Sequence, residues 1–380
     1  MKIDRLNIYS FSTVSRRQIL RNKNYLLFFA EHFSAPEYEL NFKNFGFDTF
    51  WEAQLELARS GHEHRQLVAG RVSADFGGHF VVQTNDGPIN TLHGAERMNE
   101  SNKRRKRPRP TVGDWVWLEI IPNDIPVARI VAVAERKTLF TRPDPSSDFG
   151  VQTIAANMDY VLLLTAANDE FNLARIGRYL TQIARSGAEP VLVLTKCDLS
   201  ESLAAFIEGL REANPHCRIF NTSCQSGLGL EDVSSFLHCE KTFLLLGSSG
   251  VGKSTLLNRL SGKDLMRTAT ISSLKDQGRH TTTHRELVVL PQGALLIDGP
   301  GLRSLGVESS DSVAETFSDV VALTRECRFS NCRHGTEPEC AIQEAVRTGV
   351  ISDQRLRQFK KLHSEAGKRQ RLWGQKARIR

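Results

Sequence analysis

The feature that most constrains the fold of this 380-residue chain is the glycine-rich stretch Gly247-Ser-Ser-Gly-Val-Gly-Lys-Ser254. It matches the pattern G-x-x-x-x-G-K-[ST], and it stands between an apolar segment typical of a buried strand and a segment typical of a helix. In that context the backbone N–H groups of the loop curl around the phosphates of a nucleotide, and the amino end of the helix adds its dipole. The sequence therefore predicts a nucleoside triphosphate site.

Each position of this loop is expected to take part in nucleotide binding. Lys253 would place a positive charge at the β- and γ-phosphates, where it also serves catalysis, and Ser254 would offer its hydroxyl to Mg²⁺. The other expected nucleotide-binding positions are Gly247, Ser248, Ser249, Gly250, Val251, Gly252 and Thr255.

A second motif points to the base. Thr195-Lys196-Cys197-Asp198 follows an apolar segment and matches the [NT]-K-x-D element of GTPases. Guanine presents two donors, the ring N1–H and the exocyclic amine, and one carboxylate at Asp198 can accept both. Adenine lacks this donor pair, so a desolvated carboxylate there would be left unpaired at a cost. The stem of Lys196 can lie along the ring. The motif predicts a preference for GTP and GDP.

A third short element supports this interpretation. Thr222-Ser223-Cys224 ends the next expected strand and precedes Gly227–Gly229. It resembles the loop of GTPases whose backbone N–H groups meet guanine O6, so Ser223 and Cys224 are expected at the base.

Magnesium ligands are expected from three places in the chain. Asp298-Gly-Pro-Gly301 follows an apolar segment and matches the second Mg²⁺-organising element, where the Gly301 N–H would sense the γ-phosphate and serve catalysis. Within Gly278–Thr283 (GRHTTT) a threonine is expected to close on Mg²⁺. Thr282 is favoured, although the sequence does not separate the three threonines. The expected magnesium set is Ser254, Thr282 and Asp298.

The group that orients the attacking water is not supplied by the usual glutamine. The residue after Gly301 is Leu302, which cannot hydrogen-bond water, so intrinsic hydrolysis should be slow. His280 is the nearest titratable candidate for this role. The alternative is that His280 is only a side chain of the switch loop.

The order of the motifs is unusual for a GTPase. The base motif at 195–198 precedes the phosphate loop at 247–254, whereas ordinary GTPases have the phosphate loop first. A fold can tolerate this order when its natural termini are joined and new ones are opened elsewhere. The sequence therefore predicts a circularly permuted GTPase domain.

A cysteine–histidine cluster near the carboxyl end predicts one structural zinc site. Cys327, Cys332, His334 and Cys340 offer three thiolates and an imidazole, a complete tetrahedral ligand set. The alternative is a chance grouping of free thiols. The other four cysteines lie in or beside apolar runs and are expected to be buried thiols, which fits a reducing, cytoplasmic setting. They are Cys197, Cys217, Cys224 and Cys239.

The pattern of apolar residues predicts a multidomain protein. A helix is expected over Phe47–Ser60, with Asp48 or Thr49 as its N-cap and Gly61 as its end. Five short β-rich segments then predict a small barrel of the OB type. They are Leu67–Ser73, Phe80–Thr84, Ile89–Leu92, Trp115–Ile121 and Ala128–Ala134.

From about residue 157 strands alternate with helices, which predicts a parallel α/β sheet. Its expected strands are Tyr160–Thr165, Val191–Thr195, Arg218–Asn221 and Thr242–Leu246, with a hairpin-like pair at Leu287–Leu290 and Ala294–Ile297. Its expected helices are Leu173–Ser186, Ala204–Glu212, Leu230–Leu237 and Ser254–Leu260. The expected domains are an extension with one helix (1–64), an RNA-binding OB barrel (65–138), the permuted P-loop GTPase (143–305) and an α-helical zinc-binding domain with a basic tail (306–380).

The charge of the chain suits a polyanionic partner. Its net charge is +7 with an isoelectric point near 9.1. Two regions concentrate the cations: the run Lys103–Arg109, and residues 353–380, with ten Lys and Arg against Asp353 and Glu365. A solvated charged helix is the alternative for the second. No apolar stretch approaches 18 residues, so no membrane span is expected.

Together these motifs resemble the RsgA/YjeQ family of circularly permuted GTPases over about residues 65–375. The resemblance rests on GDWV at Gly113–Val116 and on TKCD, GSSGVGKST, GRHTTT, DGPG and CRFSNCRHGTEPEC. It implies a role in late maturation of the small (30S) ribosomal subunit, contact with its 16S rRNA and hydrolysis stimulated by that subunit. The family's suspected catalytic histidine falls on His280. A cytoplasmic monomer that binds neither DNA nor membranes is expected.

Two features depart from the family pattern. DGPG stands where DTPG is more usual, and this change leaves Asp298 and Gly301 intact. The extension before residue 65 is longer than is typical, and the sequence assigns it no role.

Two other functions fit parts of the sequence. A GTP-gated binding module for another structured RNA would have the same barrel and basic tail. A metabolic P-loop enzyme, such as a small-molecule kinase, would share the phosphate loop, but TKCD and Leu302 argue against it because guanine specificity and slow turnover suit a switch.

Overall fold

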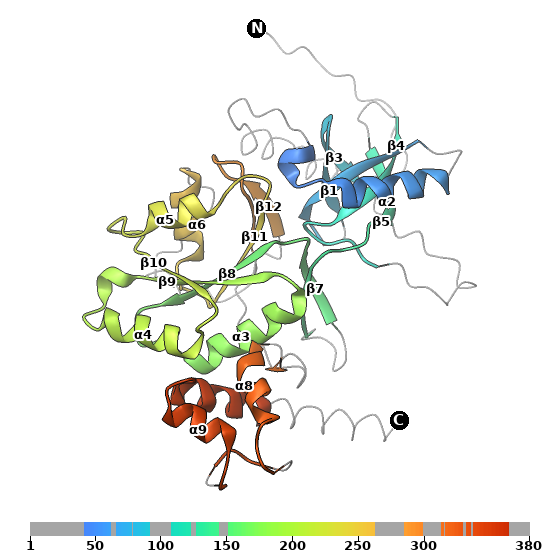
Figure 1. Ribbon diagram of the computed structural model, residues 1–380. Coiled ribbons are helices and arrows are strands. Elements are labelled where there is room, and N and C mark those ends of the chain that lie inside the picture. The colour runs from blue at the N-terminus through green and yellow to red at the C-terminus, as the bar shows by residue number, and fades with distance from the viewer. Residues whose placement is uncertain are drawn as a thin grey trace. The chain divides into compact units, whose positions relative to one another are not determined.

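The computed structural model describes eleven stretches of the chain, all within the compact unit formed by residues 40–380 (Figure 1). The stretches are 42–61, 66–77, 79–91, 108–122, 127–143, 151–262, 285–298, 313–314, 316–329, 332–335 and 337–364. Several expected features lie outside them: His280, Thr282, Gly301, Leu302, most of the run Lys103–Arg109 and the tail beyond residue 364.

The first five strands form a closed barrel, which confirms the prediction. Its strands are β1 (Leu67–Asp75), β2 (Phe80–Thr84), β3 (Gly87–Thr91), β4 (Trp115–Ile121) and β5 (Val127–Val133). They are ordered β1-β2-β3-β5-β4, and a further pairing of β1 with β4 closes the ring. Closure leaves no free strand edge within the ring and buries the inward-facing side chains.

The barrel interior explains one glycine of β1. A Cβ at Gly70 would lie 2.4 Å from Val82 Cγ1 and 2.8 Å from Leu118 Cδ1. Val72, Val82 and Leu118 are fully buried in the same apolar cluster. Close packing of this kind leaves no room for a side chain at position 70.

The segment before the barrel packs against it. It forms a 3₁₀ turn, η1 (Phe42–Phe45), and the helix α2 (Thr49–Ser60), whose N-cap is Asp48 and whose C-cap is Gly61. Phe42, Phe47 and Trp51 surround the buried Trp115 of β4, with ring centroids 4.6 to 5.8 Å from its own. The sequence predicted the helix but gave this region no role. The structure shows that it covers part of the barrel.

The second half of the sheet is the predicted parallel α/β layer. Its strands are β8 (Tyr160–Ala166), β9 (Glu189–Thr195), β10 (Arg218–Asn221), β11 (Thr242–Gly247), β12 (Arg285–Val289) and β13 (Leu295–Asp298). They are ordered β10-β9-β8-β11-β13-β12, parallel except for β12, which is antiparallel to β13 as the predicted hairpin requires. Its helices are α3 (Leu173–Ser186), α4 (Leu203–Ala213), α5 (Leu230–Phe236) and α6 (Lys253–Ser261).

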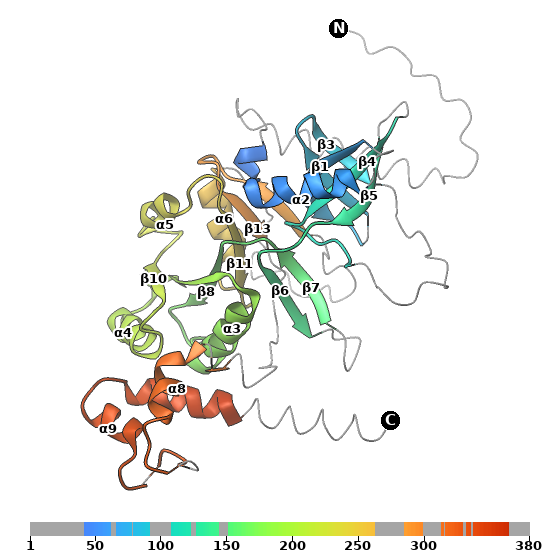
Figure 2. The ribbon, with the colours of Figure 1, turned by 45° about the vertical axis from the view of Figure 1, so that its right-hand side comes forward.

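Two features of the sheet were not predicted. The strands β6 (Leu139–Pro143) and β7 (Val151–Ala156) form a separate antiparallel pair beside α3 (Figure 2). In addition, β1 of the barrel pairs with β12, so the barrel and the α/β layer form one continuous sheet of 11 strands. The end of β1 that extends beyond its pairing with β4 carries no sequence signal for a partner outside the barrel.

The carboxyl-terminal region is helical, as predicted. It contains α8 (Ser318–Thr324), α9 (Ala341–Arg347) and a helix over 353–364. The predicted stripe Leu356, Phe359 and Leu362 is buried in its core. Arg355, counted among the tail cations, is also buried, and it pairs with Asp319 with an Nη2–Oδ1 distance of 2.8 Å. Thus Arg355 is not available to a polyanionic partner.

One prediction about cysteines is wrong. Cys239 is exposed, and Cys217 and Cys224 are only partly buried; of the four expected buried thiols, Cys197 alone is fully buried. An apolar neighbourhood in the sequence does not bury a side chain at a strand connection.

No helix in the described stretches is long and apolar enough to cross a membrane.

Candidate functional site

The phosphate loop lies between the carboxyl end of β11 and the amino end of α6. Gly247, Gly250 and Gly252 have φ angles of 155°, 79° and 104°, a region that side chains rarely adopt. A Cβ at Gly247 would also lie 2.9 Å from the carbonyl oxygen of Leu164. The backbone therefore requires glycine at these positions, as expected for a loop that wraps around phosphates.

Lys253 and Asp298 form the charged part of this site. Lys253 Nζ donates to the carbonyl oxygens of Gly247 and Ser248, at 2.9 and 2.8 Å. Asp298 ends β13, in register with Leu245 of β11. Burial raises the pKa of Asp298 to about 6, an effect that the charge of Lys253 opposes. Burial also lowers the pKa of Lys253. The site thus combines one cation with one carboxylate.

The base motif is tied directly to the phosphate loop. Thr195 is buried at the end of β9, and its hydroxyl donates to the carbonyl oxygen of Val251 at 2.7 Å. Lys196 has a φ of 57°, which turns the chain sharply at the strand end. Asp198 follows this turn and is exposed. A carboxylate presented in this way can accept hydrogen bonds from a ligand.

The loop after β10 lies beside the base motif. The N–H of Cys197 donates to the carbonyl oxygen of Thr222 at 3.1 Å, which joins the two elements. The hydroxyl of Ser223 accepts from the N–H groups of Gln225 and Ser226, which fixes the turn. In the described part of the chain no hydrogen bond engages the N–H of Cys224. That group is available for an acceptor such as guanine O6.

Two further residues shape this loop, and sequence reasoning missed one of them, Arg259. Arg259, on α6, donates from Nε to the carbonyl oxygen of Cys224 at 2.9 Å, so the helix after the phosphate loop supports the base loop. Gly229 lies so close to β10 that a Cβ there would be 2.0 Å from the carbonyl oxygen of Asn221. A sequence signal existed for the glycine, in Gly227–Gly229, but none pointed to Arg259.

The structure thus brings four of the predicted elements to one edge of the sheet: 195–198, 222–224, 247–254 and Asp298. Thr255 is exposed on α6. His280, Thr282 and Gly301 lie outside the described residues. The carboxyl ends of parallel strands are where α/β sheets bind ligands.

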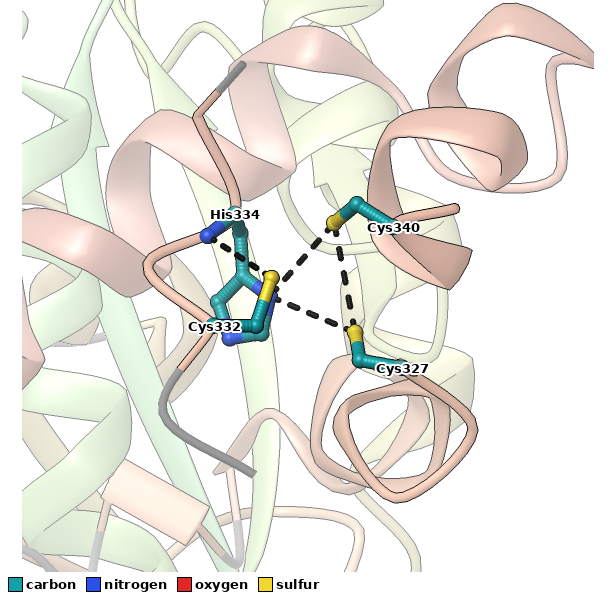
Figure 3. Close-up of side chains that lie close together, drawn as sticks. All are labelled: Cys327, Cys332, His334 and Cys340. Carbon is teal, nitrogen blue, oxygen red and sulfur yellow. Dashed lines mark hydrogen bonds between the residues drawn. The ribbon is translucent and has the colours of Figure 1, made fainter. Parts of the chain in front are cut away.

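The four metal-ligating candidates converge in the carboxyl-terminal region, and Figure 3 shows their side chains pointing toward one another. Cys327 Sγ lies 3.9 Å from Cys340 Sγ, and His334 Nδ1 lies 3.5 and 3.7 Å from these two sulfurs. All four ligand atoms lie within 4.8 Å of one another. Zn–S bonds of about 2.3 Å and Zn–N bonds of about 2.0 Å in a tetrahedron require separations of about 3.8 Å between two sulfurs and about 3.5 Å between sulfur and nitrogen. The cluster fits a zinc ion.

The loops around the cluster are held by hydrogen bonds. The carboxylate of Glu337 accepts from the N–H groups of Arg333 and Gly335, at 2.9 and 2.7 Å. The carbonyl oxygen of His334 accepts from Gln343 and Lys360, both at 2.6 Å. These bonds fix the backbone on both sides of His334, as surrounding groups do in structural metal sites.

The phosphate loop and Asp298 follow neighbouring parallel strands of one sheet, and the base motif comes earlier in the chain than both. This arrangement defines a circularly permuted P-loop GTPase. The RsgA GTPase family model matches residues 133–308. The small ribosomal subunit biogenesis GTPase RsgA of Syntrophotalea carbinolica is 38% identical over 339 residues, which cover 86% of this chain and 90% of that protein. The chain belongs to the RsgA GTPase family, so it binds guanine nucleotides and hydrolyses GTP.

Other relatives agree with this assignment. A protein of the same name from Methanosarcina acetivorans is 36% identical over 318 residues, which cover 83% of this chain and 84% of that protein. The crystal structure of YjeQ from Thermotoga maritima superposes with a TM-score of 0.59 at 26% identity, covering 79% of this chain and 99% of that one. YloQ, described as a circularly permuted GTPase, has a TM-score of 0.58 at 22% identity, covers 81% of this chain and 98% of that one, and shares the fold.

Proposed function

We propose that this GTPase binds the small (30S) ribosomal subunit, acts in its late maturation and is stimulated by it to hydrolyse GTP. The observation that supports this most is the name of the relatives, small ribosomal subunit biogenesis GTPase, at up to 38% identity over 86% of this chain. The match also covers 90% of the length of that relative, so the similarity extends well beyond the GTPase sheet.

The nucleotide would be held at the edge of the sheet described above. Asp198 accepts the two guanine donors, and the N–H of Cys224 faces O6, whereas the N–H of Ser223 donates to the carbonyl oxygen of Leu228 at 2.9 Å. The phosphate loop surrounds the phosphates, with Lys253 at the β- and γ-phosphates. Ser254, Asp298 and Thr282 would hold Mg²⁺, which when bound would neutralise charge on the β- and γ-phosphates.

Hydrolysis forms a bond between a water oxygen and the γ-phosphorus and breaks the bond to the β–γ bridging oxygen. Because Leu302 cannot orient that water, the proposal assigns the task to His280, with the N–H of Gly301 at the γ-phosphate. We expect a docked subunit to raise the slow intrinsic rate by positioning His280 and Gly301 at the γ-phosphate.

The cysteine cluster would hold one structural zinc ion through Cys327, Cys332, His334 and Cys340. All four positions of a tetrahedral ion are then taken by protein atoms, so the ion would support the fold and carry no reaction. Beside it, the helix over 353–364 buries Leu356 and Phe359 on one face and exposes Arg357 and Lys361 on the other. Cations on such a face suit RNA phosphates.

We assign two contacts with 16S rRNA: the exposed cations of the helix over 353–364, and the barrel. Its order β1-β2-β3-β5-β4 is that of a closed OB barrel, a fold that binds oligonucleotides. The proposal takes 65–138, 143–305 and 306–380 as the three domains after the extension 1–64, and it places the protein in the cytoplasm as a monomer that binds no DNA.

The proposal is tested by measuring GTP turnover with and without purified 30S subunits, together with co-sedimentation in the presence of a non-hydrolysable GTP analogue. Stimulated turnover and co-sedimentation with 30S subunits are expected. Equal binding to tRNA or mRNA fragments, without stimulation by subunits, would favour a GTP-gated module for another structured RNA.

A further inference from the structure

Arg71, on β1 of the barrel, is almost completely buried, with 2% of its surface exposed. Its Nε donates to the carbonyl oxygen of Gly113 at 3.3 Å, and its Nη1 donates to the carbonyl oxygen of Phe45. Its Nη2 donates to the carbonyl oxygen of Asn157 at 3.0 Å and to the hydroxyl of Thr242 at 2.9 Å. One guanidinium thus joins η1, the barrel and two segments of the GTPase sheet.

Burying the charged guanidinium of Arg71 costs free energy. Burial lowers the pKa of Arg71 to about 10, and Asp159 and Asp114 oppose this only through their charge. No ion pair to a carboxylate is formed by Arg71 within the described stretches. A buried cation whose partners are neutral is expensive compared with an apolar side chain of similar size. Its four acceptors are, however, all satisfied by one side chain.

Thr242 connects this contact to the phosphate loop. It is the first residue of β11, whose last residue is Gly247. Its N–H also donates to Asp159 Oδ2 at 2.8 Å, and Lys241 Nζ donates to Asp159 Oδ1 at 3.1 Å. The start of the strand that carries the phosphate loop is therefore held from the barrel side by Arg71 and from its own sheet by Asp159.

A second link lies at the carboxyl end of β1. Ala74 and Asp75 pair with Glu286 and Arg285 of β12. Arg285 Nη1 also donates to the carbonyl oxygen of Thr153 on β7, at 2.9 Å. Arg285 follows the GRHTTT motif by two residues, and β12 pairs with β13, which ends in Asp298. A movement of β1 would thus be transmitted to β12 and, through β12, to β13, which ends in Asp298.

We propose that Arg71 is a positioning residue: by joining the barrel to the start of β11, it transmits a rearrangement at the phosphate loop to the barrel, so that the barrel's affinity for its RNA depends on the bound nucleotide. This inference rests on the proposed function, because the small subunit is the ligand. Coupling between two sites is reciprocal, so the subunit would change the affinity for the nucleotide by the same factor.

The test measures the dissociation constant for purified 30S subunits twice, with a non-hydrolysable GTP analogue and with GDP, and takes the ratio. For the unaltered protein we expect a ratio of about 5 to 150. Arg71→Met should bring the ratio close to one, and Thr242→Val, which removes one of the four acceptors, should lower it about threefold or more. Affinity for GDP alone should change by less than about twofold in both variants, since neither residue touches the nucleotide site.

Thr91→Val is the matched control, because Thr91 is an equally buried threonine whose hydroxyl, within the described stretches, bonds only to Phe80 of the barrel. It should leave the ratio unchanged. A purely structural role of Arg71 would weaken subunit binding equally with both nucleotides and leave the ratio intact, which would overturn the inference. If Arg71→Met fails to fold, Thr242→Val decides by the same criterion.

The unaltered protein separates this inference from the proposed function. If it binds 30S subunits with a ratio of one, nucleotide and barrel are uncoupled and the inference is wrong, although subunit binding stands. If it does not bind 30S subunits at all, the proposed function is wrong.

Discussion

Thr195 Oγ1 donates to the carbonyl oxygen of Val251 at 2.7 Å and lies 3.2 Å from the carbonyl oxygen of Thr165. The first residue of the base motif is therefore anchored to the middle of the phosphate loop, 56 positions later in the chain. The two halves of the nucleotide site are held in a fixed geometry by a buried hydroxyl before any ligand binds. Preorganisation of this kind lowers the cost of ordering on binding.

Thr195→Val should weaken the binding of GTP and GDP to the same extent, by about 5- to 10-fold, since a buried hydrogen bond contributes about 1 kcal/mol and Val251 would lose its donor. Thr195→Ser should retain most of the affinity. Titration with fluorescent GDP and GTP analogues measures both. Thr181→Val, which removes another buried threonine hydroxyl, on α3, should have no effect on nucleotide affinity. Unchanged binding in Thr195→Val would mean that the link does not organise the site.

Asp198→Asn should exchange base preference from guanine to xanthine. The amide presents one donor and one acceptor where the carboxylate presented two acceptors, which mismatches guanine and suits the extra carbonyl of xanthine. The loss in GTP binding should be on the order of 10-fold to several 100-fold, from about 1–3 kcal/mol for each unpaired group. Competition between GTP and XTP measures it, with Asp232→Asn on α5 as the control. If Asp198→Asn binds GTP like the unaltered protein, another residue reads the base.

Metal analysis should find about one zinc per chain, bound by the four residues of the cluster. Cys332→Ser should reduce the zinc content and lower the thermal stability of the carboxyl-terminal region, while GDP affinity stays unchanged. Cys239→Ser is the control, because Cys239 is exposed and lies outside the cluster. Removal of zinc by a chelator should impair subunit binding more than nucleotide binding. A metal-free protein with an intact carboxyl-terminal fold would refute the zinc site.

The Mg²⁺-dependent part of GDP affinity should fall below about pH 6. Burial raises the pKa of Asp298 to about 6, and only the carboxylate form can hold Mg²⁺. The gain in affinity from Mg²⁺ should therefore be constant above this pH and decrease about 10-fold per unit below it. Titrations with Mg²⁺ and with chelator between pH 4.5 and 8 give the difference directly.

The same pKa has a consequence for stability. Because the folded-state pKa lies above the ordinary value of 3.8, the folded protein binds the proton more tightly than the unfolded chain. The contribution of Asp298 to the free energy of unfolding should thus decrease as the pH rises from about 4 to about 6. Asp298→Asn should remove both pH dependences. If they persist in that variant, they arise from another group, such as the phosphates of the nucleotide.

His280→Ala should remove most of the subunit-stimulated GTP hydrolysis while leaving GTP binding, subunit binding and the slow intrinsic rate nearly unchanged. The histidine would orient water only when the docked subunit fixes its loop, and positioning of this kind contributes about 100- to 10,000-fold. Turnover with saturating 30S subunits, at several salt concentrations, measures the effect. Higher salt should weaken the stimulation steeply, because docking depends on phosphate contacts. Full stimulation of His280→Ala would place the catalytic group in the ribosome.

Much of the α/β layer could be predicted because its signals are local. Leu173–Ser186 and Arg218–Asn221 were predicted with the bounds that the structure has, since an amphipathic period with a capping residue, or an apolar run between turns, is legible in a few residues. The strands β6 and β7 were missed because they are stabilised mainly by each other and by α3. Their pairing is not visible in either segment alone.

The sequence by itself determined the candidate site: the phosphate loop, the base motif, the aspartate proposed for magnesium, the four candidate metal ligands and the order that makes the GTPase permuted. Each of these depends on residue types at fixed short spacings. Only the tertiary structure decided how they are joined, through Thr195 and Val251, Arg259 and Cys224, and Arg71 and Thr242. These pairs are 35 to 171 positions apart, and a single hydrogen bond between distant residues leaves no periodic trace in the chain.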